Sequence, residues 1–195
     1  MPRYLSVLEL KDYARSEIPT ADDAFIEAAC DSAENFMDQA CARRFVVATS
    51  ATARVFMPLS GGLLRIHDCT TVTLVVNDGT TLTAADYQLE PLNGLTWAGE
   101  SRPYDQIRLT SGTTWDRDSY GEATISVTAT WGWVAIPPRV KQAALIVAKE
   151  IITNRDEVKF GLVGFSDVGG VSPRSNPIVT ETINHYRRVE AIGIA

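Results

Sequence analysis

Residue types that could act as nucleophiles, bases or metal ligands are few in this chain of 195 residues and lie far apart. His67, Asp68 and Cys69 are consecutive, which suggests a base, an orienting acid and a thiol. Adjacent side chains of a strand point to opposite faces, however, so His67 and Asp68 would not meet in one site. The other histidine, His185, has no H-x-x-x-H or H-E-x-x-H setting. The sequence therefore predicts neither a catalytic histidine nor a Cys/His metal site.

A glycine-rich segment superficially resembles a phosphate-binding loop. Gly161-x-x-Gly164 and Gly169-Gly170 lack the Lys-Ser/Thr pair of a P-loop and the strand-to-helix context of a dinucleotide site. Ser166, in the same segment, lacks the second glycine of a nucleophile elbow. We therefore expect no cofactor and no serine nucleophile.

Acidic and aromatic side chains leave two alternatives open. The pairs Asp22/Asp23 and Asp116/Asp118 have the residue types of glycosidase carboxylates, and a hydrolase of this kind would depend on His67 or Asp116. The start of a helix explains the first pair more simply, and a polar turn explains the second. A β-rich carbohydrate-binding or tail-associated binding module is the other alternative, because four tryptophans would suit a sugar platform: Trp97, Trp115, Trp131 and Trp133. Core packing is the simpler interpretation of Trp131.

The net charge of -6 argues against sequence-independent binding to DNA or anionic membranes, because both need an excess of cationic side chains. The longest purely apolar run, Ala143 to Ala148, is too short to cross a bilayer, and Met1-Pro2-Arg3-Tyr4 lacks the apolar core of a signal peptide. We therefore expect a protein made in the cytoplasm, with no membrane partner.

The three cysteines show no paired spacing. Cys30 and Cys41 on one helix would lie roughly 16 Å apart, at about 1.5 Å per residue, which is beyond disulfide reach. We expect Cys30, Cys41 and Cys69 to be free buried thiols.

The first 44 residues favour two helices. Ser6-Val7-Leu8-Glu9 has the form of a capping box and predicts a short helix from Val7 to about Ser16. A second helix is expected to start at Thr20-Ala21-Asp22-Asp23 and to end near Arg43 and Arg44, with charges that suit the helix dipole. Its expected packing stripe consists of Phe25, Ala29, Ala33, Phe36 and Ala40.

From Phe45 to about Trp133 the apolar residues recur with a period of two, which is typical of strands. The clearest strand runs from Ala123 to Trp131. Val72 to Val76 followed by Asn77-Asp78-Gly79 predicts a hairpin, because Asp-Gly tolerates the positive φ of a tight turn. Further short strands are expected at 87–91 and 106–109, so the middle of the chain is predicted to be an inserted antiparallel β subdomain.

The junction Trp131-Gly132-Trp133 to Pro137-Pro138 ends the last strand and begins a third helix at Pro138. The apolar residues of this helix cover about 160° of arc, which is wider than a simple amphipathic stripe and calls for two neighbours. The second helix of the same chain is one candidate neighbour, and a different subunit is the other candidate. The residues of the arc are Val140, Ala144, Leu145, Val147, Ala148, Ile151 and Ile152.

The loop from Gly161 to Ser175 is glycine-rich but too apolar for a disordered linker, which favours an ordered loop covered by a partner. Asn176-Pro177 then caps a last helix. We expect Ile178, Ile183, Tyr186 and Val189 on one side of that helix, with Arg187 and Arg188 near its end. Helix-dipole charge explains these two arginines best; contact with an acidic partner or a nucleic-acid backbone is the alternative.

The order of these features resembles the gp6-like head-tail connector (adaptor) proteins of tailed bacteriophages over nearly the whole chain. The resemblance rests on helix, helix, β insertion, Tyr87-Gln88-Leu89-Glu90-Pro91 with Asn93-Gly94-Leu95, Trp131-Gly132-Trp133 through Pro137-Pro138-x-Val140-Lys141, and Asn154-Arg155-Asp156. It implies a non-enzymatic virion protein of the neck, commonly twelve copies in a ring, that joins the portal vertex to the tail. Its partners would be itself, the portal protein and a tail-side stopper or completion protein, with DNA passing through the lumen.

These interpretations predict an α+β fold in two parts. Residues 1–44 and 134–195 form a helical adaptor core, and residues 45–133 form the antiparallel β subdomain. Contacts between subunits are expected at Leu145, Ala148 and Ile152. Contacts with the portal are expected from the glycine-rich loop and the C-terminal helix, at Phe165, Val168, Val171, Arg174, Ile178, Ile183, Tyr186, Arg187 and Arg188.

Overall fold

The structure is a computed structural model that describes residues 3–14, 23–58, 61–94, 100–110, 112, 114–116, 124–157 and 176–188, with the backbone alone for 154–157. Four helices and a six-stranded antiparallel sheet make up this part of the chain, so the predicted α+β class is confirmed. The chain divides into two compact units. One consists of Met1–Ala42 and Ile136–Val189 and the other is built on Arg43–Ala135; each is described by itself.

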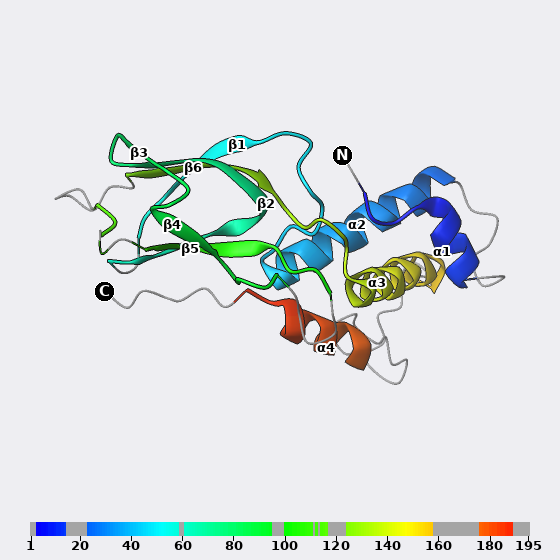
Figure 1. Cartoon of the computed structure of the whole chain (residues 1–195). Coiled ribbons are helices and arrows are strands. Elements are labelled where there is room, and N and C mark those ends of the chain that lie inside the picture. Colours follow the sequence, from blue (N-terminus) through cyan, green and yellow to red (C-terminus); the bar gives the residue numbers. More distant parts are fainter. Residues whose placement is uncertain are drawn as a thin grey trace. The chain divides into compact units, whose positions relative to one another are not determined.

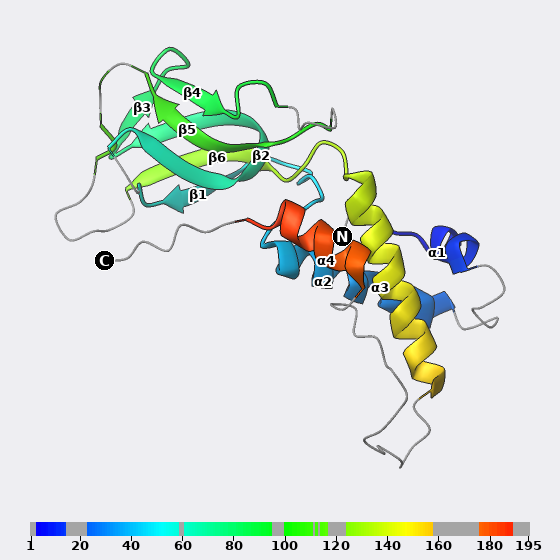
Figure 2. The same cartoon turned by 90° about the horizontal axis from the view of Figure 1, so that it is seen from below.

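The helical unit contains the four helices. They are α1 (Val7–Ala14), α2 (Asp23–Cys41), α3 (Pro138–Glu157) and α4 (Pro177–Tyr186). Helix α2 packs along α3, α1 contacts both of these helices, and α4 lies against α3 and α2 (Figure 2). The first helix, the proline start of α3 and the proline-capped α4 are where the sequence predicts them.

The buried stripe of α2 differs in part from the predicted one. Ala29 and Ala33 are buried as expected, whereas Phe25, Phe36 and Ala40 are only half-buried. The buried stripe is centred on a different line along α2 from the predicted stripe. Its other members are Ile26, Cys30, Glu34, Met37 and Cys41. The small residues in it let α3 approach closely, which the sequence predicted, but the large side chains that fill the gaps are Ile26 and Met37.

The sheet unit contains six strands in the order β1-β6-β2-β5-β4, with β3 paired to β2. They are β1 (Thr52–Phe56), β2 (Leu63–Asn77), β3 (Thr80–Leu82), β4 (Tyr87–Glu90), β5 (Tyr104–Leu109) and β6 (Ile125–Trp131). The Asp78-Gly79 hairpin and the strict alternation of β6 are confirmed. Neither β1 nor the first half of β2 was recognised as an individual strand.

Strand β2 belongs to two layers. Its first residues, Leu63 to Arg65, pair with β5, and Cys69 to Asn77 pair with β6, with register shifts between these stretches. Figure 1 shows β1, β6 and β3 on one side of the unit and β4 and β5 on the other. Such register shifts bend and twist a strand, which allows the sheet to fold over its own core.

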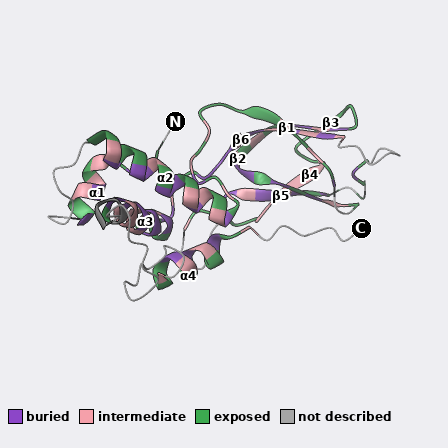
Figure 3. Ribbon diagram, turned by 180° about the vertical axis from the view of Figure 1, so that it is seen from behind, coloured by how far each residue is buried: buried purple, intermediate pink, exposed green. Residues whose placement is uncertain are grey.

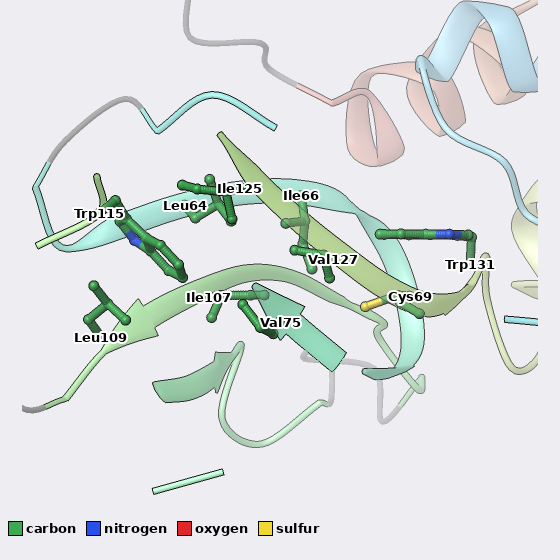
Figure 4. Close-up of a cluster of buried hydrophobic side chains, with 11 residues drawn as sticks. Leu64, Ile66, Cys69, Val75, Ile107, Leu109, Trp115, Ile125, Val127 and Trp131 are labelled. Carbon is green, nitrogen blue, oxygen red and sulfur yellow. The ribbon is translucent and has the colours of Figure 1, made fainter. Parts of the chain in front are cut away.

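The core of the sheet unit fills the space between the layers. Leu64, Ile107 and Val127 are completely buried, and Trp115 and Trp131 lie at opposite ends of the cluster (Figure 4). β6 contributes every second residue to this core, so its remaining side chains face the other side of the sheet.

Candidate interaction surfaces

Asp68 joins the two chain segments that enter and leave the sheet unit. Its side chain is 4% exposed, and its carboxylate forms an ion pair with Arg43 and accepts a hydrogen bond from Trp133 Nε1 at 2.9 Å. Its backbone oxygen accepts a hydrogen bond from the Gly132 N–H at 2.7 Å. The Trp133 ring also contacts Phe45, with the ring centres 5.4 Å apart. Arg43 is therefore part of a buried ion pair beyond the end of α2, which the expectation of a helix-dipole charge missed.

Gly132 allows the close approach on which this arrangement depends. Its φ is +108°, and a Cβ atom at this position would lie 2.1 Å from the backbone oxygen of Val46. Beside this close approach, the Ala48 N–H donates a hydrogen bond to the backbone oxygen of Trp131 at 2.7 Å. Trp131-Gly132-Trp133 is thus a structural motif: the two rings anchor neighbouring segments, and the glycine makes room for them.

The consecutive residues His67 and Asp68 point to opposite sides of β2, as predicted, since His67 is exposed and Asp68 is buried. His67 Nδ1 lies 2.9 Å from Arg54 Nη1, and the Arg54 guanidinium lies over the Trp131 ring at 4.5 Å. Burial raises the pKa of the Cys69 thiol to about 12, so this thiol remains protonated at neutral pH. The three groups do not form a nucleophile, base and acid.

The described residues do not support the hydrolase alternative or the carbohydrate-binding alternative. Asp116 exchanges two hydrogen bonds with Asn77, at 3.0 and 3.1 Å, and so connects the segment 114–116 to the end of β2. Trp115, Trp131 and Trp133 are 2–4% exposed and cannot form a platform; Trp97, Asp22 and Asp118 lie outside the described residues.

Within the same described ranges, no group of three or more His, Cys, Asp or Glu side chains is arranged to hold a metal ion. Cys30, Cys41 and Cys69 are buried and none of the three forms a disulfide, as predicted. None of the described helices has the length and apolar character needed to span a membrane.

The N-terminal segment is attached to α2 by a buried carboxylate. Glu34 Oε1 accepts hydrogen bonds from the backbone N–H groups of Tyr4 and Leu5, at 2.9 and 2.7 Å. Burial raises the pKa of Glu34, although these two hydrogen bonds oppose the shift. The predicted capping box is present, with Ser6 and Glu9 bonded reciprocally, and Glu9 also pairs with Lys141 of α3.

The predicted subunit-contact residues of α3 differ in exposure. Ala148 is completely buried and Ile152 is 3% exposed, so both are already covered within one chain. Leu145 is half-buried and retains surface. The wide apolar arc is explained largely by α1, α2 and α4 of the same chain, and within it only Leu145 and Ile151 are half-buried.

The predicted portal-contact residues of α4 also divide into two groups. Ile178 is 45% exposed and Arg187 is exposed, whereas Tyr186 is 4% exposed and packs inside the helical unit. Ile183 and Arg188 are half-buried, and the Arg188 N–H donates to the Cys41 oxygen at 2.8 Å. Helix α4 has both buried and exposed residues (Figure 3). Its buried residues are Val179, Thr182 and Tyr186, so the exposed Ile178 does not share the side of Tyr186, with which the sequence pattern grouped it. Phe165, Val168, Val171, Arg174 and Val189 lie outside the described residues.

A surface that the sequence reasoning missed lies on the sheet unit, on the side of β1, β6, β2 and β3 opposite the core. The register aligns Val55 with Ser126 and Val76, and Ala53 with Thr128 and Leu74. We call this surface the outer sheet face; its residues are Ala53, Val55, Thr71, Leu74, Val76, Thr81, Ser126, Thr128 and Thr130. All of them are exposed or half-buried and none is charged. The alternation of Thr and Val in 71–76 and 124–130 was its signal, but the pairing was needed to align the strands.

Comparison with known proteins finds similarity at the level of fold. No protein-family model and no curated protein sequence matches the chain. A chain in a structure described as "Neck of empty GTA particle computed with C6 symmetry" is similar over 97% of this chain and 92% of that chain, with a TM-score of 0.56 and 19% identity. A chain in "Virion of native gene transfer agent (GTA) particle" is similar over the same shares, with a TM-score of 0.55 and 18% identity. Both the helical and the sheet unit therefore belong to a fold found in these particles.

Proposed function

We propose that the chain is a structural protein of the neck of a tailed phage-like particle, a head-to-tail adaptor of the gp6-like kind. In this role it forms a homo-oligomeric ring that joins the portal vertex to the tail and continues the DNA channel. The observation that carries the proposal is the similarity over almost the full length of both chains to a protein in a gene transfer agent neck. This similarity covers 97% of this chain and so includes the sheet unit.

The chemistry of the described residues fits an assembly role. The histidine and the thiol that could have supported a reaction are separated, with His67 exposed against Arg54 and Cys69 in the core. Buried polar groups such as Asp68 and Glu34 are used to tie segments together. The net charge of -6 suits a channel wall that DNA must pass without adhering, because like charges repel.

We assign portal binding to the exposed side of α4 and to the loop before it. Ile178 and Arg187 combine an apolar and a cationic contact that the fold of the helical unit leaves uncovered. Exposed aliphatic and arginine side chains are common at interfaces, and arginine is enriched there. Leu145 of α3 is the corresponding candidate for a contact with the next copy in the ring.

Sedimentation of the purified protein with and without the portal protein tests this function. We expect a ring, alone or on the portal, and we expect Ile178→Asp with Arg187→Glu to reduce portal binding at least tenfold. Leu8→Asp is the matched control, because Leu8 is 69% exposed on α1 of the same unit and should leave binding unchanged. A protein that stays monomeric at every concentration and ignores the portal would refute the proposal. Removal of residues 177–195 should likewise abolish portal binding while the sheet unit stays folded.

A further inference from the structure

Two arginines of the sheet unit lie close to each other without a carboxylate partner. The Arg54 guanidinium lies over the Trp131 ring at 4.5 Å and 2.9 Å from His67 Nδ1, which holds it in place. Burial and, to a lesser extent, the nearby charge of Arg44 lower the pKa of Arg54. Among the described residues, neither arginine forms an ion pair with a carboxylate. The two cations therefore repel each other, and an anion bound beside them would relieve this repulsion.

Other arginines of the sheet unit are neutralised by carboxylates. Arg43 pairs with the buried Asp68, and Arg102 Nη2 lies 3.3 Å from Asp105. Their charges cancel locally, whereas those of Arg44 and Arg54 do not. We call Arg44 and Arg54 the arginine pair; it lies at the end of the core that Trp131 marks, because Arg54 stacks on that ring. Arg44 is exposed, so the arginine pair is accessible to a partner.

The opposite end of the same core is acidic. Trp115 marks that end (Figure 4), and Asp116 directly follows it in the chain. Asp78 lies beside Asp116, because the preceding residue, Asn77, donates a hydrogen bond to the Asp116 carboxylate at 3.0 Å. Both aspartates are exposed, and neither forms an ion pair with any residue that the structure describes. The sheet unit thus carries unpaired charges of opposite sign at the two ends of one core.

We infer that the arginine pair of one copy binds the acidic end, Asp78 and Asp116, of the next copy, an inference that rests on the proposed ring. A ring needs a heterologous contact, in which two different surfaces of the chain meet. Patches at opposite ends of one core satisfy this requirement, because each copy offers one end to each neighbour. Opposite charges also fix the order of the copies, since like ends repel. A DNA phosphate fits the arginine pair less well as a partner, because the chain as a whole has a net charge of -6.

Charge reversal tests the contact in the purified full-length protein, free of DNA and at low salt, where exposed charges are least screened. Arg44→Glu should reduce the fraction of chains in rings at least tenfold, as measured by sedimentation. Arg44→Gln removes the charge without reversing it and should give a smaller loss. Because Arg44 is exposed, the sheet unit should stay folded, which unchanged tryptophan fluorescence would verify. Lys11→Glu is the control: it changes the net charge equally on α1, where the Lys11 side chain is 41% exposed, and should leave the rings intact.

Compensating reversals identify the partner surface. Asp78→Lys combined with Arg44→Glu should restore the rings, because the two reversed ends attract each other again. Asp116→Lys provides the same test at a second position, since Asp78 has a φ of +43°, which lysine adopts less readily. Native ring levels of Arg44→Glu, an equal loss with Lys11→Glu, or no restoration by either lysine would overturn the inference, as would an effect of Arg44→Glu on DNA or portal binding alone. If the unaltered protein forms no ring, the proposed function itself fails, and that result is distinct from these.

Discussion

Replacement of Gly132 by alanine should strongly destabilise the sheet unit. The φ of +108° lies in a region that is essentially restricted to glycine, and a residue with a side chain there costs about 1–3 kcal/mol. The added Cβ would also lie 2.1 Å from Val46 O and 2.8 Å from Val47 Cα, so one backbone segment must move.

The movement has a second cost. It would disrupt the hydrogen bonds Ala48 N–H to Trp131 O and Gly132 N–H to Asp68 O, each worth about 1 kcal/mol. The sum is about 3–5 kcal/mol, against a total of about 5–15 kcal/mol for a typical domain. We therefore expect Gly132→Ala to lower the free energy of unfolding of the sheet unit by about 3–5 kcal/mol.

Two other glycines distinguish the cost of the positive φ from the cost of the steric clash. Gly79 has a φ of +79° but open space around its Cβ position, so Gly79→Ala should cost only the backbone term of about 1–2 kcal/mol. Gly62 has open space and an ordinary φ, so Gly62→Ala should change stability by less than about 0.5 kcal/mol.

Urea unfolding followed by tryptophan fluorescence is the assay, because all four tryptophans lie between Arg43 and Ala135 and report on the sheet unit. If Gly132→Ala loses no more stability than Gly79→Ala, the close approach of the Val46 backbone is not what holds this junction, and our reasoning is refuted.

Three further outcomes are expected. Asp68→Asn should cost about 2–3 kcal/mol because it removes the closer of the two carboxylates that pair with the buried Arg43 guanidinium, and Asp105 at 4.0 Å remains. Adding Arg43→Met should recover part of the loss in a double-mutant cycle; additive losses would contradict the pairing. Because folding raises the pKa of Glu34, this carboxyl group stabilises the folded chain at pH values below its unfolded pKa of about 4.5. This stabilisation is lost as the pH rises through the pKa of Glu34 in the folded chain. Glu34→Gln keeps the acceptor oxygen without the charge, so its stability relative to the native chain should rise between pH 4.5 and 7 by urea unfolding followed by circular dichroism; a pH-independent difference would contradict this. The thiols of Cys30 and Cys69, whose pKa burial raises to about 11 and about 12, should react with a thiol reagent only upon unfolding, and rapid labelling of the native protein would show that they are accessible.

The features that the sequence predicted correctly depend on residues close together in the chain. The capping box of Ser6 and Glu9, the proline start of α3 at Pro138, the Asp78-Gly79 turn and the Asn176 cap each involve groups within about four residues of one another. Local backbone geometry and short-range hydrogen bonds decide such elements, so their residue types are sufficient signals. The alternation of β6 belongs with them because its period is visible in a single strand.

The candidate surfaces required the tertiary structure. Arg43 and Asp68 are 25 residues apart, and Asp68 and Trp133 are 65 apart, so no local pattern indicates that they meet. Ala148 and Ile178 also could not be told apart from the sequence, because an apolar side chain on a helix can be buried within its own chain or remain exposed. Packing of α2, α3 and α4 covered the first and left the second exposed. The composition alone determined a net-acidic chain with few reactive groups, whereas strand pairing across the sheet decided which Val and Thr side chains lie together on one uncharged face.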